Sequence, residues 1–249
     1  MIVWQKKSII FFMRLPLTKY GWPEAVVFPA IILAVMIILL VGGPRFLPLR
    51  TIGWIETPLA VVLIWFLSFF RDPKRSCPTD KDVLLAPADG QVTNIDFVTE
   101  DSFIGAAAVR IGIFLSIFDV HINRSPCDAK VERIIYKRGG YKNARNLLSG
   151  QVNESNDIGL VRTNRPLDRL LLRQISGAIA RRIVCDINEG EHLHIGQKFG
   201  MIKFGSRTEL YVPAGENVKC LVKVGDKVKA GLTPLVKYEI SHEDTKSQR

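Results

Sequence analysis

The stretch QKFGMIKFGSRTELYV, residues 197–212, places a glycine–serine pair between two short runs rich in apolar residues. Residues 197–204 and 209–212 have the composition and the spacing of apolar side chains that are typical of β-strands. Gly205 and Ser206 lie between these runs, where glycine permits unusual backbone geometry. The stretch therefore predicts two strands on either side of a Gly-Ser bond, inside a domain built mainly from strands.

The same texture extends on both sides of this stretch, from residue 80 to about residue 240. Short runs rich in Val and Ile alternate with Gly, Pro, Asn and Asp, as in a β domain. The polar stretch 143–156 is expected to be a loop. Further strands are expected at residues 83–85, 91–95, 108–111, 130–136 and 169–174. The predicted fold class is mainly β, and α+β at most.

The C-terminal part carries a recurring turn pattern, in which Val-Gly-Asp is followed by Val-Lys-Ala-Gly within residues 224–231. This pattern resembles the hairpins of lipoyl and biotinyl carrier domains, which are flattened β barrels. The resemblance implies a lipoyl-like, barrel-sandwich-like β domain. A true carrier domain also presents a modifiable lysine at a hairpin tip, commonly between methionines, and this chain has no such Met-Lys pairing.

The N-terminal part differs, because residues 26–41 and 57–70 form two long uncharged apolar stretches with a turn-rich connector between them. A spanning helix needs about 20 residues, which each stretch reaches with its polar flank. We expect a membrane-associated helical hairpin over residues 1–75 and a separate domain over residues 76–249. Arg45 and Arg50 in the connector leave shallow insertion open as an alternative. A signal peptide would have one shorter stretch and a small-residue cleavage site.

The charge distribution favours a membrane surface over nucleic acid. The net charge is +10, and small groups of Lys and Arg lie beside the apolar stretches. Such flanks mark the cytoplasmic side and attract anionic lipids, so we expect the cell membrane with the folded domain on its cytoplasmic side. No basic patch is interleaved with aromatics, so no nucleic-acid partner is expected. The four cysteines lack CxxC or zinc-site spacing, which favours a reducing compartment and no metal site.

Four short segments carry the chemistry, although each is weak on its own. In this order and spacing they resemble the short-form phosphatidylserine decarboxylase family, whose members are pyruvoyl-dependent enzymes made as proenzymes. The resemblance covers residues 69 to 238. The segments are Phe69-Phe70-Arg71-Asp72-Pro73, Ala86-Pro87-Ala88-Asp89-Gly90, Phe118-Asp119-Val120-His121-Ile122-Asn123-Arg124 and Phe204-Gly205-Ser206-Arg207.

The resemblance implies that the chain cuts itself between Gly205 and Ser206. The products would be a β chain, residues 1–205, and an α chain, residues 206–249, which form a heterodimer. Ser206 would become a covalently bound pyruvoyl group, the cofactor of the enzyme. Its ketone would form a Schiff base with the amine of phosphatidylserine and accept the electrons released as carbon dioxide leaves, giving phosphatidylethanolamine.

The residue types suit this chemistry. A serine hydroxyl can attack the preceding carbonyl if a base and an orienting group activate it. His121 is the candidate base and Asp89 the candidate orienter, in a Ser/His/Asp arrangement. His121 is also the candidate general acid for decarboxylation. Long-form relatives carry a second histidine where this chain has Arg124, whose guanidinium suits the substrate's phosphate or carboxylate.

Two alternatives remain at this point. One is archaetidylserine decarboxylase, which uses the same chemistry on an ether lipid with the same headgroup. The other is a non-enzymatic, membrane-anchored adaptor with a lipoyl-like barrel, which explains the apolar hairpin but not the coincidence of Asp89, His121 and Gly205-Ser206. The membrane phospholipid substrate is common to both enzymes, and a higher oligomer is left open.

Overall fold

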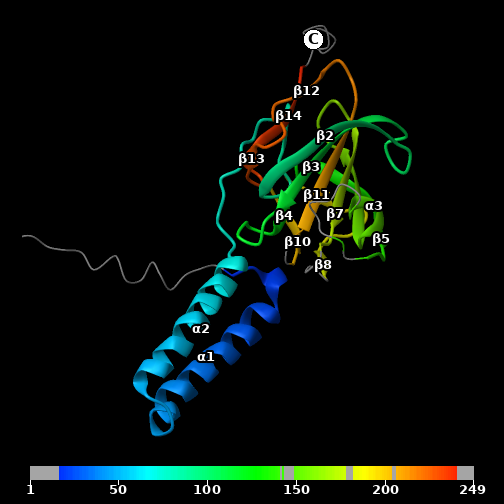
Figure 1. The fold of residues 1–249 in the computed structure, drawn as a ribbon. Helices are drawn as coiled ribbons and strands as arrows, with labels where there is room; N and C mark the ends of the chain where they lie inside the picture. The colour runs from blue at the N-terminus through cyan, green and yellow to red at the C-terminus, as the bar shows by residue number, and fades with distance from the viewer. Residues whose placement is uncertain (1–16, 141, 143–148, 178–181, 204–205, 240–249) are drawn as a thin grey trace, which may run out of the picture. The chain divides into compact units, whose positions relative to one another are not determined.

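The computed structural model describes residues 17–140, 142, 149–177, 182–203 and 206–239 (Figure 1). The chain divides into two units, Met1–Lys74 and Arg75–Arg249. The described part of the first unit is helical, and the second unit is built mainly from strands. The structure thus confirms the predicted mainly β fold class with a preceding pair of apolar helices.

The helical unit is a hairpin. After the 3₁₀ turn η1 (Lys19–Gly21), helix α1 (Glu24–Gly42) is followed by the 3₁₀ turn η2 (Gly43–Arg45) and helix α2 (Leu49–Phe69). Helices of 19 and 21 residues are about 30 Å long, close to the thickness of a bilayer's hydrocarbon core. Both are long and apolar enough to cross a membrane.

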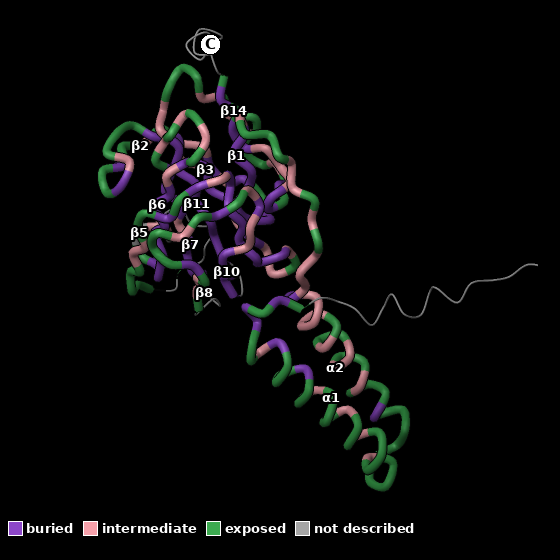
Figure 2. The backbone as a smooth tube through the Cα atoms, turned by 180° about the vertical axis from the view of Figure 1, so that it is seen from behind, coloured by how far each residue is buried: buried purple, intermediate pink, exposed green. Residues whose placement is uncertain are grey.

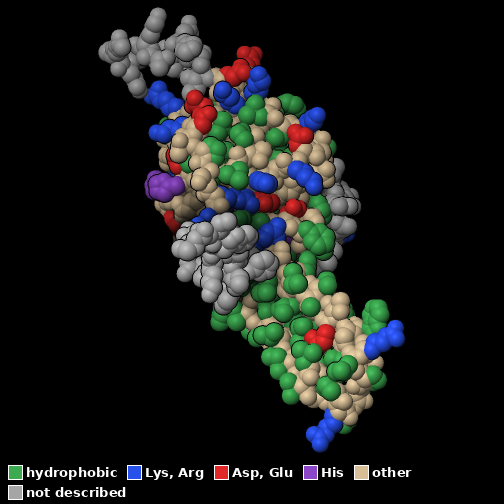
Figure 3. All heavy atoms as spheres, turned by 90° about the vertical axis from the view of Figure 1, so that its left-hand side faces the viewer, with side chains coloured by type: hydrophobic (Ala, Val, Ile, Leu, Met, Phe, Trp, Pro, Cys, Tyr) green, Lys and Arg blue, Asp and Glu red, His purple; other side chains and the backbone are tan. Residues whose placement is uncertain are grey.

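Most side chains of this hairpin are exposed or half-buried, in contrast to the strands (Figure 2). Its surface is largely hydrophobic, with few charges (Figure 3). Val41 and Trp54, for example, are 80 % and 72 % exposed. An apolar surface of this extent is unfavourable in water and marks a membrane or protein contact, which supports membrane association.

The β unit is organised around an eight-stranded antiparallel sheet with the order β13-β2-β3-β11-β7-β6-β5-β9, which is curled (Figure 1). Strand β11 lies in the interior of this sheet, between β3 and β7. The strands are β2 (Gly90–Glu100), β3 (Ala106–Leu115), β5 (Ala129–Lys137), β6 (Ser155–Arg162), β7 (Arg169–Ile175), β9 (His192–Leu193), β11 (Ser206–Pro213) and β13 (Lys227–Val228).

Two three-stranded sheets complete the unit, with the orders β1-β14-β12 and β4-β10-β8. The second of these brings β10, which precedes the Gly-Ser bond, beside the strand that follows His121. The strands are β1 (Val83–Leu85), β4 (Ile122–Arg124), β8 (Ile183–Cys185), β10 (Lys198–Ile202), β12 (Val218–Cys220) and β14 (Pro234–Tyr238).

The alternation of side chains along β11 gives the large sheet two different faces. Leu210 and Val212 point into the main hydrophobic core, together with Leu172 of β7 and Ile113 of β3. We call this the inner face, and Ser206 and Thr208 belong to it by the same two-residue period. Arg207, Glu209 and Tyr211 therefore lie on the opposite, outer face.

The strands expected at 83–85, 91–95, 108–111, 130–136 and 169–174 are confirmed. The expectation of a loop over 143–156 is wrong in part, because helix α3 occupies Ser149–Val152 and β6 begins at Ser155. Ser155 and Asn156 are polar but buried, since β6 pairs with β5 on one side and β7 on the other. Tertiary pairing overrides the local polar pattern here.

Candidate active site

Ser206 is the first residue of β11 and is fully buried. Its strand partner on β3 is Leu115, and its side chain lies on the inner face. The Ser206 Oγ atom has no hydrogen-bond partner among the residues that the structure describes. Gly205, the other half of the predicted cleavage site, lies outside the described residues. A buried hydroxyl without a partner is costly, which fits a group kept for a reaction.

His121 lies at the same end of the β unit as Ser206. It is fully buried and directly precedes β4. Its backbone carbonyl accepts a hydrogen bond of 3.3 Å from the N–H of Ile202, the last residue of β10. This bond links His121 to the segment that leads into Ser206, which follows Ile202 by four positions in the chain. The Nδ1 atom of His121 is 3.0 Å from the backbone carbonyl of Asp119.

Asp89 is also buried, but its carboxylate faces a different partner from the one predicted. Arg75 donates two hydrogen bonds to it, of 2.5 and 2.7 Å, and the backbone N–H of Ala230 donates a third of 2.8 Å. Arg75 is the first residue of the second unit, and its side chain is only 7 % exposed. The predicted direct contact from Asp89 to His121 is therefore not made in this structure, because two other groups occupy the carboxylate.

The glycine that follows Asp89 has a structural requirement. Gly90 has a φ of +149°, and a Cβ atom there would lie 2.1 Å from the backbone oxygen of Phe114. No residue with a side chain fits this close approach of β2 to β3. The Asp-Gly pair thus fixes the start of β2 and, with it, the position of the Asp89 carboxylate.

Arg124 closes β4 and is 5 % exposed. Its Nη1 donates a hydrogen bond of 3.0 Å to the backbone carbonyl of Gly196. Arg124 is three positions after His121 in the sequence, a distance of about 10 Å along an extended chain. The structure therefore places Arg124 at the other end of β4 from His121, and its predicted contact with the substrate remains a prediction.

Beside Ser206, the inner face carries a buried amide network. Asn123 of β4 donates to the hydroxyl of Thr208 at 3.2 Å and accepts a hydrogen bond from Gln174 at 2.9 Å. Gln174 accepts in turn from Asn156 at 3.1 Å. The network links the small β4-β10-β8 sheet to the large sheet next to Ser206. A satisfied buried network of this kind is rigid, so it fixes the position of the strand that begins with Ser206.

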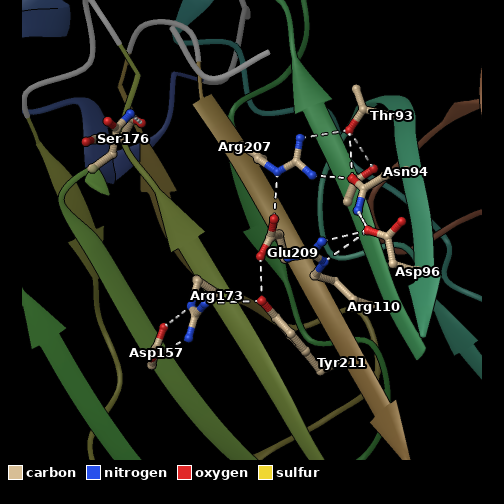
Figure 4. Close-up of polar contacts among 12 residues, drawn as sticks. Thr93, Asn94, Asp96, Arg110, Asp157, Arg173, Ser176, Arg207, Glu209 and Tyr211 are labelled. Atoms are coloured by element: carbon tan, nitrogen blue, oxygen red, sulfur yellow. Dashed lines mark hydrogen bonds and ion pairs between the residues drawn. The ribbon is translucent and has the colours of Figure 1, made fainter. Parts of the chain in front are cut away.

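The outer face of β11 carries a charged row, which we define as Arg207, Glu209 and Tyr211 (Figure 4). Arg207 and Glu209 are fully buried and form an ion pair of 2.8 Å. The Tyr211 hydroxyl donates to Glu209 at 2.7 Å. Figure 4 shows that the row is bonded on both sides, to Thr93 and Asn94 of β2 and to Arg173 of β7.

Electrostatic shifts follow the pairing in this region. Burial raises the pKa of Tyr211, and the Glu209 carboxylate adds to this. Burial alone would raise the pKa of Asp157, but its bonds to Arg173 and Lys137 outweigh burial and lower that pKa. Burial alone would lower the pKa of Arg173, but the hydrogen bonds that its guanidinium donates to Asp157, together with nearby negative charge, outweigh burial and raise that pKa. Asp157 and Arg173 are therefore charged at neutral pH, and Tyr211 is neutral.

These contacts describe a class of protein. A buried serine with an unpartnered hydroxyl begins an interior strand, directly after a glycine, and a buried histidine is tied to the strand before it. Such a site suits a chain that attacks its own backbone, and the apolar hairpin suits a protein that works at a membrane.

Comparison with known proteins gives the particular family. The phosphatidylserine decarboxylase family model matches residues 62–235. The chain belongs to the phosphatidylserine decarboxylase family.

Similar proteins come from several bacteria, and each is named phosphatidylserine decarboxylase proenzyme. The protein of Carboxydothermus hydrogenoformans is 41 % identical over 180 residues, 72 % of this chain and 83 % of the relative. That of Nitrosomonas eutropha is 42 % identical over 187 residues, 75 % of this chain and 84 % of the relative. That of Rhodopirellula baltica is 40 % identical over 223 residues, 88 % of this chain and 91 % of the relative. The alternative of a non-enzymatic adaptor finds no support in these matches.

Several residues that hold this region together carry no motif in the sequence. Arg75 belongs to a basic group after the second apolar stretch, and Gln174 lies within an expected strand. Arg207 and Glu209 are charged and occupy alternate positions of the strand, which is the usual sign of a solvent-exposed face. The signal that could have found them is register, because pairing of 206–213 with both 106–115 and 169–175 makes this an interior strand, whose charged side chains meet polar groups of other strands of the sheet.

Proposed function

We propose that this chain is a proenzyme that cuts itself between Gly205 and Ser206 and then converts phosphatidylserine to phosphatidylethanolamine and carbon dioxide. The observation that carries the proposal is the buried, unpartnered hydroxyl of Ser206 at the start of β11. Membership of the family and the proenzyme names of the relatives support the reaction. The products of cleavage are a β chain, residues 1–205, and an α chain, residues 206–249.

Cleavage begins with the Ser206 hydroxyl. His121 takes its proton while the oxygen attacks the carbonyl carbon of residue 205, and the amide becomes an ester. A proton then leaves the Cα atom of residue 206 as the ester breaks on the serine side, which leaves a carboxylate on residue 205 and a carbon–carbon double bond in residue 206. This dehydroalanine rearranges to an imine, and water adds to the imine as ammonia leaves, which makes the pyruvoyl group.

The residues present fit such a group. Residue 206 is buried, its hydroxyl has no partner among the described residues, and the inner face beside it is polar. The pyruvoyl group supplies a ketone that reacts with the substrate's amine and draws electrons from the bond to the carboxylate. His121 holds the proton that replaces carbon dioxide. Asp89, which Arg75 and Gly90 hold in position, orients the polar groups of the site. Arg124 binds an anionic group of the lipid.

We infer that the protein acts at the cell membrane, with its β unit on the cytoplasmic side. The exposed apolar surface of α1 and α2 supports insertion, and Arg71, Lys74 and Arg75 directly after α2 support the orientation. The phospholipid substrate keeps its tails in the bilayer, so an anchored enzyme meets it there. The mature enzyme is a heterodimer of the two chains. No feature of the described residues indicates a higher oligomer.

Intact mass tests the proposal. Purified wild-type protein should give two fragments that end and begin at residues 205 and 206, the second with a pyruvoyl end. Ser206→Ala should give one uncut and inactive chain. Incubation with phosphatidylserine vesicles should release carbon dioxide only from the wild-type protein. An active wild-type chain with an intact backbone and an ordinary serine at 206 would refute the proposal.

A further inference from the structure

Ser176 lies directly after β7 and has a fixed backbone. Its N–H donates a hydrogen bond of 2.9 Å to the carbonyl of Glu154. Its carbonyl accepts one of 2.7 Å from the buried side chain of Asn153. Both bonds hold the residue in line with the end of the sheet, so its side chain has a defined direction.

The register of the sheet brings Ser176 beside the reactive serine. Arg207 of β11 pairs with Ile175 of β7 in an antiparallel ladder. Continuing this register by one residue puts Ser206 opposite Ser176. Side chains directly opposite each other share a face, and their Cβ atoms are about 4.5–5.5 Å apart. Ser176 therefore points to the inner face next to Ser206, and Figure 4 shows it apart from the charged row.

The two hydroxyls share an unusual property. Ser176 and Ser206 are both fully buried, and neither Oγ atom has a hydrogen-bond partner within the described ranges. Buried hydroxyls are normally paired, because an unmade hydrogen bond is costly to leave inside a protein. The reaction accounts for Ser206, which is consumed in it. Nothing in the cleavage chemistry accounts for Ser176.

We propose that Ser176 is a substrate-binding residue, whose hydroxyl donates a hydrogen bond to an anionic oxygen of the lipid headgroup. This inference rests on the proposed function. The substrate's amine reacts at residue 206, so the headgroup carboxylate and phosphate come within a few bonds of that position. Ser176 is the neighbouring donor whose hydrogen-bonding capacity is unused until the headgroup arrives.

Removing the hydroxyl tests the proposal. Ser176→Ala should still be cleaved into two fragments, because the hydroxyl serves the substrate rather than the cut. The KM for phosphatidylserine, or the lipid concentration that half-saturates trapping on the α chain by cyanoborohydride, should rise about 10- to 100-fold. Ser176→Cys, whose thiol is nearly the same size and a weak donor, serves as a second variant if Ser176→Ala folds poorly. It should show the same rise in KM or in the half-saturating lipid concentration. Ser176→Thr, which keeps the hydroxyl, should recover most of the affinity.

Ser155→Ala is the matched control. Ser155 is similarly buried and neighbours the same strand, but it pairs with Ile175 and so lies on the outer face. This variant should bind and turn over lipid as the wild-type protein does. If Ser155→Ala and Ser176→Ala lost the same affinity for phosphatidylserine, the loss would be explained by packing and the proposal would be overturned.

The product separates the two anionic groups. Phosphatidylethanolamine keeps the phosphate and lacks the carboxylate, so weaker binding of this lipid to Ser176→Ala assigns the contact to the phosphate. Unchanged binding, with weakened phosphatidylserine trapping, assigns it to the carboxylate. A cleaved variant with wild-type trapping and KM overturns the proposal, as does a folded variant that stays uncut. If wild-type protein itself forms no pyruvoyl end, the proposed function fails first.

Discussion

The two faces of β11 differ in how completely their polar groups are paired. On the outer face, the fully buried Arg207 and Glu209 have partners on β11 and β2, and Tyr211 is bonded to Glu209 and to Arg173 of β7. On the inner face, the equally buried Ser206 and Ser176 have hydroxyls without partners among the described residues. The polar groups of the outer face are paired with one another and with neighbouring strands. The inner face keeps two hydroxyls without partners among the described residues, at the start of β11 and directly after β7, beside the paired Thr208.

The difference in hydrogen bonding suggests that the outer face has a structural role and the inner face a chemical one. A buried charge network is expensive unless each member is paired, but once paired it fixes geometry. The outer face can therefore hold the backbone of β11 while the hydroxyl on the inner face would change its bonds in the proposed cleavage. Substitutions on the inner face should impair the chemistry, and substitutions on the outer face should lower stability.

The largest expected effect is on chemistry at the inner face. Replacing the candidate base, His121→Ala, should slow the appearance of the two fragments about 10²- to 10⁴-fold on a denaturing gel. The fold should persist, as circular dichroism would show. His194→Ala is the control, because its side chain is 89 % exposed and should leave cleavage unchanged. Cleavage of His121→Ala at the normal rate would assign the base role elsewhere.

The next effect is on stability at the outer face. Arg207→Met leaves the Glu209 carboxylate buried without its guanidinium and should lower the free energy of unfolding by about 3–5 kcal/mol. Denaturant unfolding in the Ser206→Ala background, where the chain stays uncut, measures this. Arg207→Met combined with Glu209→Leu should regain most of the loss, since no unpaired charge remains. A double variant as unstable as the single one would contradict the comparison.

A smaller effect should appear with pH. The pKa of Asp157 is lowered from its ordinary value of 3.8 by its ion pairs, against the effect of burial. A lowered folded-state pKa stabilises the protein above the unfolded-state value, and this contribution is lost as pH falls through the folded value. The free energy of unfolding should thus fall as pH drops below about 4. In Asp157→Asn the free energy of unfolding should depend less on pH in this acid range. An unchanged slope of the free energy against pH would argue against this role of Asp157.

The smallest effect belongs to an exposed pair. Glu132 and Arg169 are 3.3 Å apart, with side chains 48 % and 47 % exposed. Glu132→Gln should change the free energy of unfolding by less than about 1 kcal/mol, because water and salt screen such pairs. Denaturant unfolding of Glu132→Gln and Arg207→Met under the same conditions compares the exposed pair with the buried one. A loss as large as that of the buried pair would show that burial is not the deciding variable.

The sequence predicted the architecture well where local patterns decide it. The two apolar stretches, the strand-rich texture after residue 80 and the strands beside Gly205-Ser206 all depend on composition and short-range period. Residues 155 and 156 were misjudged because their polar side chains suggested a loop, whereas both are buried in a strand that is paired on both sides. Such pairing is set by distant parts of the chain, which a local pattern does not contain.

The site was predicted less completely for the same reason. Ser206, His121 and Asp89 could be named because motifs carry them. The bond between Arg75 and Asp89 could not, because both residues suit several partners and only the fold selects one. Ser176 has no motif at all, and its place beside Ser206 follows solely from the register between two strands.

The interior position of β11 has a consequence for the two-chain product. After the cut, this strand would be the leading segment of the shorter polypeptide, yet both of its ladder neighbours belong to the longer one. Strands β13 and β14 would likewise remain paired with β2 and β1. The nicked molecule is therefore interleaved rather than merely associated, so its fragments should co-purify and come apart only when the whole sheet melts.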